Sequence, residues 1–191
     1  MSGHTNNPSI CDVNNSCLII IDVQAKLSSA IPEKAISRLR KNTTILLNAA
    51  NQLNVPVIAT AQYPKGLGPI EEFIADKLTD SSKKFDKTRF SCLGADKLPE
   101  HLNQINKKQI ILTGIEAHIC VLQSAIELMA EGYDVFVVTD AIASRLSTSY
   151  EMTVLRLNQA GCVLLNTESV LFEWLRDASH PEFKSLSKLI V

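Results

Sequence analysis

The chain has 191 residues, a length typical of one domain, and 46% of them are hydrophobic, enough to build a substantial core. Its net charge of −1 gives no electrostatic basis for binding nucleic acid or an acidic membrane surface. No hydrophobic run reaches the roughly 20 residues of a membrane span, and the polar first residues lack a signal-peptide pattern. We therefore expect a cytoplasmic protein without nucleic-acid or membrane partners.

We expect residues 1–15 to form a flexible polar arm and residues 16–191 to form one domain. Residues 17–24 are apolar on every side, which predicts a strand buried on both faces, as in a parallel sheet. Residues 33–53 repeat hydrophobic side chains at helical spacing. A second strand is predicted over residues 55–60, and a loop over residues 62–69, which hold two prolines and two glycines.

The rest of the chain continues the alternation of helices and strands. Helices are expected over residues 70–78, 95–106, 118–131 and 147–160, and strands over residues 83–90, 108–113, 134–139 and 162–165. This order predicts the α/β class, as a three-layer doubly wound α/β/α sandwich with a parallel sheet of about six strands. The C-terminal hydrophobic residues either pack in the core or form a subunit contact: Val170, Leu171, Phe172, Trp174 and Leu175.

Three reactive side chains fall where predicted strands end. Asp22 ends the first strand, Lys87 lies at the end of the third, and Cys120 follows the fourth. Ligands of doubly wound folds bind at the carboxyl ends of the strands, so these side chains are candidates for one site. Each also has an ordinary interpretation: a capping or paired carboxylate, a solvated lysine and a small buried hydrophobe. Their joint placement favours the site.

The three residue types suit nucleophilic catalysis. Cysteine attacks as the thiolate, and we expect a helix N-terminus and the nearby Lys87 to lower the pKa of Cys120. Asp22 is placed to accept the thiol proton and to return it to a leaving group. Backbone N–H groups in the turn over residues 115–120 are suited to hold an oxyanion.

The five cysteines contain no CxxC pair, so a zinc knuckle or a redox dithiol is not indicated. We expect Cys17 and Cys162 to be buried in strands, and Cys11 to be an exposed ordinary thiol in the arm. Cys92 lies near the expected site and competes with Cys120 as the fastest-reacting thiol.

The segments LIIIDVQ, DKTRFSCLG and ILTGIEAHICVLQSAIELMAEGYDVFVVTDAIASR resemble the isochorismatase-like cysteine hydrolases from about residue 16 onward. The pieces GIEAHIC, DAIASR and HPEFK make the likeness closest to the isochorismatase domain-containing proteins. The resemblance implies a sheet of order 3-2-1-4-5-6, a homo-oligomer, and a catalytic triad of Asp22, Lys87 and Cys120. It also implies a cis peptide bond between Ile115 and Glu116, in a turn that forms the oxyanion hole with Cys120.

The resemblance also implies that Gln62 lines the substrate pocket, and we expect Gln24 and His118 to line it as well. No metal or other cofactor is expected, because the family's nicotinamidases carry an Asp-x-His metal pair where this chain has Thr60-Ala-Gln62. True isochorismatases commonly lack the cysteine, so Cys120 argues against isochorismate as the substrate. The expected function is hydrolysis of a small amide or related acyl compound through a thioester. The alternatives are a non-catalytic binding or assembly protein that retains the fold, and a redox-responsive thiol protein.

Overall fold

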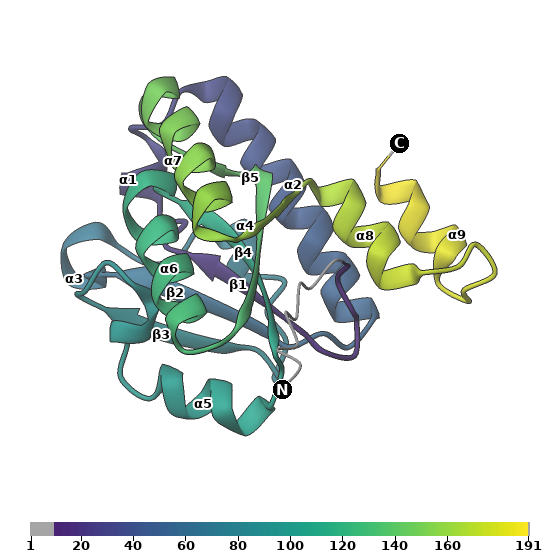
Figure 1. Cartoon of the computed structure of the whole chain (residues 1–191). Coiled ribbons are helices and arrows are strands. Elements are labelled where there is room, and N and C mark those ends of the chain that lie inside the picture. The colour runs from purple at the N-terminus through teal and green to yellow at the C-terminus, as the bar shows by residue number, and fades with distance from the viewer. Residues whose placement is uncertain (1–9, 191) are drawn as a thin grey trace.

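A computed structural model of the chain describes residues 10–190. Its centre is a six-stranded sheet in the order β3-β2-β1-β4-β5-β6, in which all neighbouring strands are parallel (Figure 1). The predicted α/β fold class and strand order are therefore confirmed. The strands are β1 (Ser16–Ile21), β2 (Val57–Gln62), β3 (Lys83–Lys87), β4 (Gln109–Ile115), β5 (Asp134–Ala143) and β6 (Val163–Leu165).

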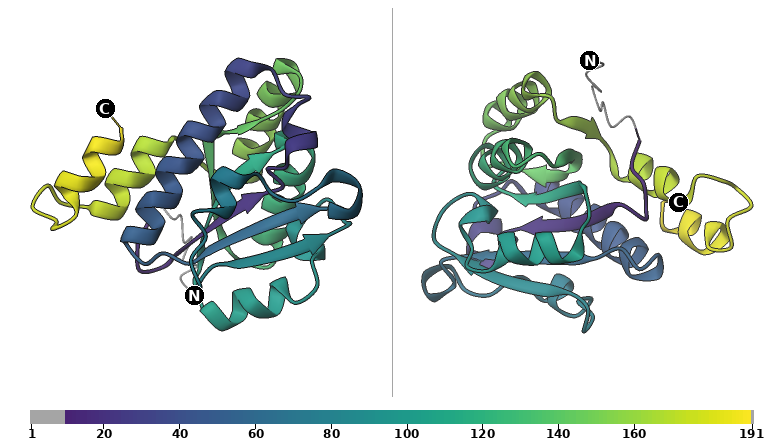
Figure 2. Two further views of the ribbon diagram at one scale, coloured as in Figure 1. Left: turned by 180° about the vertical axis from the view of Figure 1, so that it is seen from behind. Right: turned by 60° about the horizontal axis from the view of Figure 1, so that its bottom comes forward.

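Helices cover both faces of the sheet (Figure 2). One face packs against α2 (Glu33–Gln52) and α8 (Thr167–Leu175), and the other packs against α5 (Leu98–Ile105), α6 (Leu122–Ala130) and α7 (Ser147–Ala160). The short helices are α1 (Ala25–Ser28), α3 (Pro64–Leu67), α4 (Glu72–Ala75) and α9 (Phe183–Leu186). Single 3₁₀ turns occupy Cys92–Gly94 and Ser187–Leu189, and a π-helical turn over Ala117–Val121 leads into α6. None of the described helices is long and apolar enough to cross a membrane.

The central strands are apolar because they are buried on both faces. Every residue of β1, β2 and β4 is buried. Successive side chains of a strand point to opposite faces, so Leu18 and Ile20 join the core under α2, while Ile19 and Ile21 join the core under α6. A continuous apolar run in the sequence thus serves two cores at once.

Several element boundaries differ from the predicted ones. The first strand ends at Ile21 rather than Gln24, because Asp22 adopts the left-handed conformation with φ 51° and turns the chain away. The fifth strand is longer than predicted and runs to Ala143. The helix expected over residues 70–78 is only the four-residue α4. The predicted helix over 118–131 begins with the π-helical turn that carries Cys120.

The C-terminal hydrophobic segment packs in the molecule's own core. Val170, Leu171, Trp174 and Leu175 are buried, and the Trp174 indole N–H donates to Ser16 Oγ at 3.0 Å. Of the two interpretations left open for this segment, the core interpretation is therefore confirmed for these residues. Phe172 is the exception: it is 39% exposed, and its ring packs on Phe183 at 6.1 Å between centroids.

The expected N-terminal arm extends over residues 1–15, of which residues 1–9 lie outside the described part of the chain. The expectation that Cys11 is exposed is wrong, since the residue is completely buried. Its backbone N–H donates to Glu173 Oε2 at 2.7 Å, and Arg176 donates to its carbonyl at 3.0 Å. Burial raises the pKa of the Cys11 thiol, and the Glu173 carboxylate raises it further.

Candidate active site

Asp22 lies immediately after β1 and is completely buried. Its Oδ1 accepts a hydrogen bond from Thr60 Oγ1 at 2.6 Å, which ties the end of β1 to β2. On the other side, β4 passes so close to β1 that a Cβ atom on Gly114 would lie 2.1 Å from the Ile21 carbonyl oxygen. Only glycine fits there, with φ +120°, so the ends of these strands converge.

Lys87 is the last residue of β3, and its side chain has no exposed surface. Its Nζ lies 2.5 Å from Asp22 Oδ2 and donates to Gln62 Oε1 at 2.7 Å. It also donates to the carbonyl groups of Phe90 at 2.8 Å and Arg89 at 3.2 Å. Lys87 is therefore a buried cation that links three strand ends, rather than the solvated surface charge that was its ordinary interpretation.

Cys120 lies in the π-helical turn after β4, where the cis peptide bond between Ile115 and Glu116 is present as the resemblance implied. The residue is 5% exposed and borders a cavity of about 410 Å³. The Asp22 carboxylate and the Glu116 backbone N–H lie close enough to its sulfur to shift the pKa of the thiol. The fold thus brings together all three side chains that the sequence placed at strand ends.

The electrostatic environment of Cys120 differs from the expected one. Burial raises the pKa of its thiol to about 12, and the Asp22 carboxylate contributes to the rise. Lys87 and the Glu116 N–H lower this pKa, but their effect is smaller than that of burial. The expectation of a lowered pKa is therefore wrong. Near neutral pH the resting thiol is protonated and adjacent to a carboxylate that can accept its proton.

The cavity beside Cys120 is predominantly apolar. Sequence reasoning missed its five hydrophobic lining residues: Leu27, Tyr63, Leu67, Phe90 and Ile119. Three polar residues complete the lining beside Cys120: Gln62, Thr88 and Glu116. The rule that sites gather at strand ends points to Tyr63 and Phe90, which follow β2 and β3 closely. Nothing in the sequence singles out Leu27 or Ile119.

The three predicted pocket residues have different positions. Gln62 does line the cavity, and its Nε2 donates to the Thr88 carbonyl at 2.7 Å. Gln24 does not line it, because its completely buried amide bonds to the backbone of Gln62 and Gly68. Nor does His118, whose Nδ1 lies 2.9 Å from Ser144 Oγ. Gln24 therefore fixes the loop after β2, and His118 contacts the loop after β5.

Glu116 connects the turn that carries Cys120 to the loop after β5. Its carboxylate accepts hydrogen bonds from the backbone N–H of Arg145 at 3.1 Å and from Arg145 Nε at 3.0 Å. The carboxylate side chain is 8% exposed, whereas the Arg145 side chain is 54% exposed. The ion pair therefore fixes the cis-peptide turn from its solvent side.

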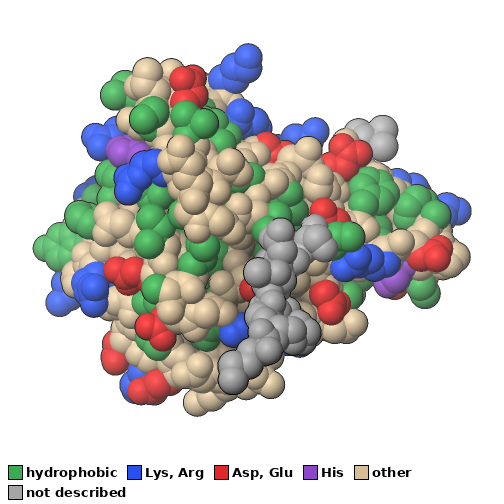
Figure 3. Space-filling view, in the orientation of Figure 1, with side chains coloured by type: hydrophobic (Ala, Val, Ile, Leu, Met, Phe, Trp, Pro, Cys, Tyr) green, Lys and Arg blue, Asp and Glu red, His purple; other side chains and the backbone are tan. Residues whose placement is uncertain are grey.

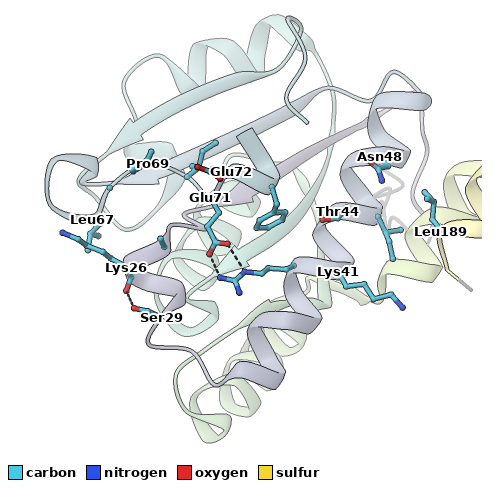
Figure 4. A pocket seen from close by; sticks show the side chains of 16 residues that line it. Lys26, Ser29, Lys41, Thr44, Asn48, Leu67, Pro69, Glu71, Glu72 and Leu189 are labelled. Atoms are coloured by element: carbon cyan, nitrogen blue, oxygen red, sulfur yellow. Dashed lines mark hydrogen bonds and ion pairs between the residues drawn. The ribbon is translucent and has the colours of Figure 1, made fainter. Parts of the chain in front are cut away.

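A larger hollow of about 1020 Å³ lies between α2 and residues 67–73 (Figure 4). Among its polar side chains, Arg40 donates twice to Glu71, at 2.8 and 3.0 Å. Asp22, Lys87 and Cys120 are not among its lining residues, so this hollow is not the reactive site. Within residues 10–190, no group of three or more His, Cys, Asp or Glu side chains is arranged to hold a metal ion. The expectation that the site needs no metal stays a prediction, which the resistance of any activity to chelators would test.

The site lies where β1 and β4 are neighbours, the point at which the strand order of this doubly wound sheet reverses. The architecture is thus that of an α/β protein with a ligand site at the switch point of its sheet. The Isochorismatase domain model matches residues 16–169, and the chain belongs to the isochorismatase family.

Known proteins of this family align with nearly the whole chain. Isochorismatase domain-containing protein 2 of Xenopus laevis is 40% identical over 182 residues, which are 93% of this chain and 84% of that protein. The structure of MAR1 ribonuclease from Caenorhabditis elegans has a TM-score of 0.88 and 35% identity, covering 95% of this chain and 92% of that one. The YcaC gene product of Escherichia coli, an octameric hydrolase of unknown specificity, has a TM-score of 0.87 and 26% identity, with coverage of 95% and 89%. The chain therefore has the isochorismatase-family hydrolase fold.

Proposed function

We propose that the protein is a cysteine hydrolase that cleaves a small amide or related acyl compound through a thioester at Cys120. The observation that carries this proposal is the position of the Cys120 sulfur, which borders a cavity and lies beside the Asp22 carboxylate. A nucleophile, a base and a group that orients the base are the parts that covalent acyl transfer requires.

In the first half of the reaction, the carbonyl carbon of the amide approaches the Cys120 sulfur from the cavity. Asp22 accepts the thiol proton as the sulfur–carbon bond forms. The carbon–nitrogen bond then breaks, and Asp22 gives the proton to the departing amine. The products of this half are a thioester on Cys120 and a free amine, and Asp22 is again a carboxylate.

In the second half, a water molecule occupies the place that the amine has left. Asp22 accepts a proton from this water as its oxygen attacks the thioester carbon. The carbon–sulfur bond breaks as Asp22 gives this proton to the sulfur, and the carboxylic acid leaves. Because the thiol of the resting protein is protonated, the cycle starts and ends in the same state.

The remaining groups have supporting roles. Lys87 keeps the Asp22 carboxylate oriented through its 2.5 Å ion pair and lowers the pKa of the Cys120 thiol. The Glu116 N–H, which lies next to the sulfur, and the N–H groups that begin a helical turn are suited to stabilise the oxyanion of the tetrahedral intermediate. Removing one such donor typically costs about 100- to 1000-fold in kcat.

The direct test is ammonia release from a panel of small primary amides. We expect turnover by the native protein and by Cys162→Ala, which removes a cysteine from the far end of the sheet, but none by Cys120→Ala. Acid quenching during turnover followed by mass spectrometry should find an acyl group on the peptide that contains Cys120. Binding of amides without turnover would favour the non-catalytic alternative. Peroxide-sensitive labelling of Cys120 without amidase activity would favour the redox alternative.

We further propose a cytoplasmic homo-oligomer, a dimer or larger. Support comes from the octameric Escherichia coli relative and from hydrophobic side chains that remain exposed on and before α7 (Figure 3). Leu146, Met152 and Leu155 are 63%, 59% and 56% exposed. Light scattering should therefore give a mass of at least twice 21.0 kDa, and a single species at the chain mass would contradict the proposal.

A further inference from the structure

The cavity beside Cys120 presents apolar surface and no unpaired charge to a ligand. Its hydrophobic lining comes from four different segments, so an acyl group that enters is surrounded by apolar groups. Of its polar side chains, Gln62 has both ends of its amide engaged, by Lys87 and by the Thr88 carbonyl. Tyr63 and Thr88 offer hydroxyl groups, which are polar but uncharged.

The charged groups nearest the cavity occur as pairs. Glu116 is the one charged residue in the lining, and it pairs with Arg145 at 3.0 Å. Asp22 and Lys87 lie outside the lining and neutralise each other at 2.5 Å. Each pair brings one charge of each sign, so neither leaves a net charge for a substrate. An ion that moved from water into this cavity would lose its hydration without gaining a counter-ion.

Three cations lie close to these elements in the chain, and none of them lines the cavity. Lys65 is exposed on α3, and the other two contact groups elsewhere. Lys26 belongs to the lining of the larger hollow in Figure 4, and its Nζ donates to the Gly66 carbonyl at 2.8 Å. Arg89 lines a separate surface hollow and lies 3.8 Å from Glu127. Neither is among the residues that line the cavity beside Cys120.

We infer that the site selects acyl substrates that are uncharged, with an apolar or aromatic acyl group, and rejects substrates that carry a carboxylate or an ammonium group on the acyl side. This inference rests on the proposed hydrolase function, because it names the substrate class of the same site. It also explains product release. Hydrolysis converts a neutral amide into an acid that ionises in water, and the cavity provides no cation to retain the carboxylate.

The first experiment tests the charge preference without requiring turnover. Iodoacetamide and iodoacetate alkylate thiols by the same displacement of iodide and are similar in size, but only iodoacetate is anionic. The alkylation rate of Cys120 with each reagent is measured by peptide mapping and divided by the rate for glutathione, which corrects for intrinsic reactivity. We expect the normalised ratio of iodoacetamide to iodoacetate at Cys120 to be at least about 10. A ratio near 1, or one that favours iodoacetate, would overturn the inference.

Three variants test whether the cavity causes this preference. Phe90 is 51% exposed at the rim, so its replacement leaves the core intact. Phe90→Lys places a cation at the cavity and should reduce the iodoacetamide preference several-fold, whereas Phe90→Leu should preserve it. Phe172→Lys, at an exposed aromatic residue of α8 outside the lining, should also preserve it. If Phe90→Lys and Phe172→Lys behave alike, the preference does not come from this cavity.

The second experiment uses benzamide, 4-carbamoylbenzoate and 4-(aminomethyl)benzamide, which share one ring and one scissile amide. We expect kcat/KM for the neutral amide to exceed that of either charged amide by about 100-fold.

Equal or faster turnover of a charged amide refutes the substrate class and leaves the hydrolase function standing. If no amide in any panel is cleaved and Cys120 still prefers iodoacetamide, the hydrolase function fails while the cavity's selectivity for uncharged molecules holds. If Cys120 shows no such preference, the inference is overturned whether or not amides are cleaved.

Discussion

Lys87 and Asp22 form an ion pair from which solvent is excluded, with Nζ and Oδ2 2.5 Å apart and both side chains fully buried. Desolvation makes such a pair costly to bury, and loss of one partner leaves an uncompensated charge that destabilises a protein by about 3–5 kcal/mol. The two residues differ in the number of polar contacts that each keeps when the other is replaced. Without Asp22, Lys87 still has three oxygen acceptors, whereas without Lys87, Asp22 keeps only two uncharged neighbours, the Thr60 hydroxyl and the Cys120 thiol.

Lys87→Met should therefore lower the free energy of unfolding more than Asp22→Asn does. We expect a loss of about 3–5 kcal/mol for Lys87→Met and about 1–3 kcal/mol for Asp22→Asn. Asparagine also tolerates the left-handed conformation of residue 22. Urea unfolding measures both changes. Lys84→Met, at an exposed position of the same strand, is the control and should stay within about 0.5 kcal/mol. Equal losses for the two buried variants would contradict this view of the pair.

Cys120 should be the first of the five thiols to react with iodoacetamide. It borders the cavity, whereas the other cysteines are 0–5% exposed and do not line it. Because its pKa is raised to about 12, the alkylation rate should rise about tenfold per pH unit across the neutral and mildly alkaline range. Lys87→Ala should slow the reaction, since Lys87 lowers this pKa. Earlier labelling of Cys92, with no effect of Lys87→Ala, would remove Cys120 from the proposed mechanism.

The convergence of Asp22, Lys87 and Cys120 could be predicted because parallel strands bring their carboxyl ends to one edge of the sheet. To place each residue at this edge, it was enough to locate the end of the strand before it. The buried strands that precede Asp22 and Cys120 are easy to locate, because each is a continuous apolar run. The order of the strands and the cis peptide bond came instead from the resemblance to a known family. Neither follows from local pattern alone.

The rest depends on contacts that local sequence does not encode. Cys11 looked exposed because its neighbours are polar, yet its N–H bonds to Glu173, 162 residues away. Gln24 looked like a pocket residue, but its amide is used by backbone 38 and 44 residues further along. The pKa of Cys120 depends on a balance between burial and charge, and burial is set by the packed turn rather than by nearby residue types.

Glu116 should act on catalysis as a positioning residue, because it fixes the turn that carries Cys120 by bonding Arg145. Glu116→Gln keeps the size of the side chain and removes the charge of the pair. We expect kcat to fall by about 10-fold or more, with a small change in KM, since misplacing a reacting group by about 1 Å can cost 100-fold. Arg145→Met should behave similarly, and the double variant should lose less than the product of the two effects.

Steady-state kinetics on the best amide of the panel separate kcat from KM for these variants. Arg156→Met, on the exposed side of α7, is the matched control and should leave both constants unchanged. The alkylation rate of Cys120 reports independently on the conformation of the turn that carries it. This rate should also change in Glu116→Gln. A rise in KM alone would instead make Glu116 a substrate contact.

Alkaline pH should destabilise the fold through its buried thiols. Burial raises the pKa of Cys162 from 9.0 to about 11. A thiol with a raised pKa favours the folded state while it is protonated, so its contribution is complete below pH 9 and is lost as pH rises toward 11. Between these values, the free energy of unfolding should fall by about 1.4 kcal/mol per pH unit for this thiol alone.

Urea unfolding under reducing conditions, at several pH values from about 8 to 11, measures the slope. Cys162→Ala should be flatter than the native protein by about that amount, and the two curves should run parallel below about pH 8. Parallel curves over the whole range would show that Cys162 titrates alike in the folded and unfolded states.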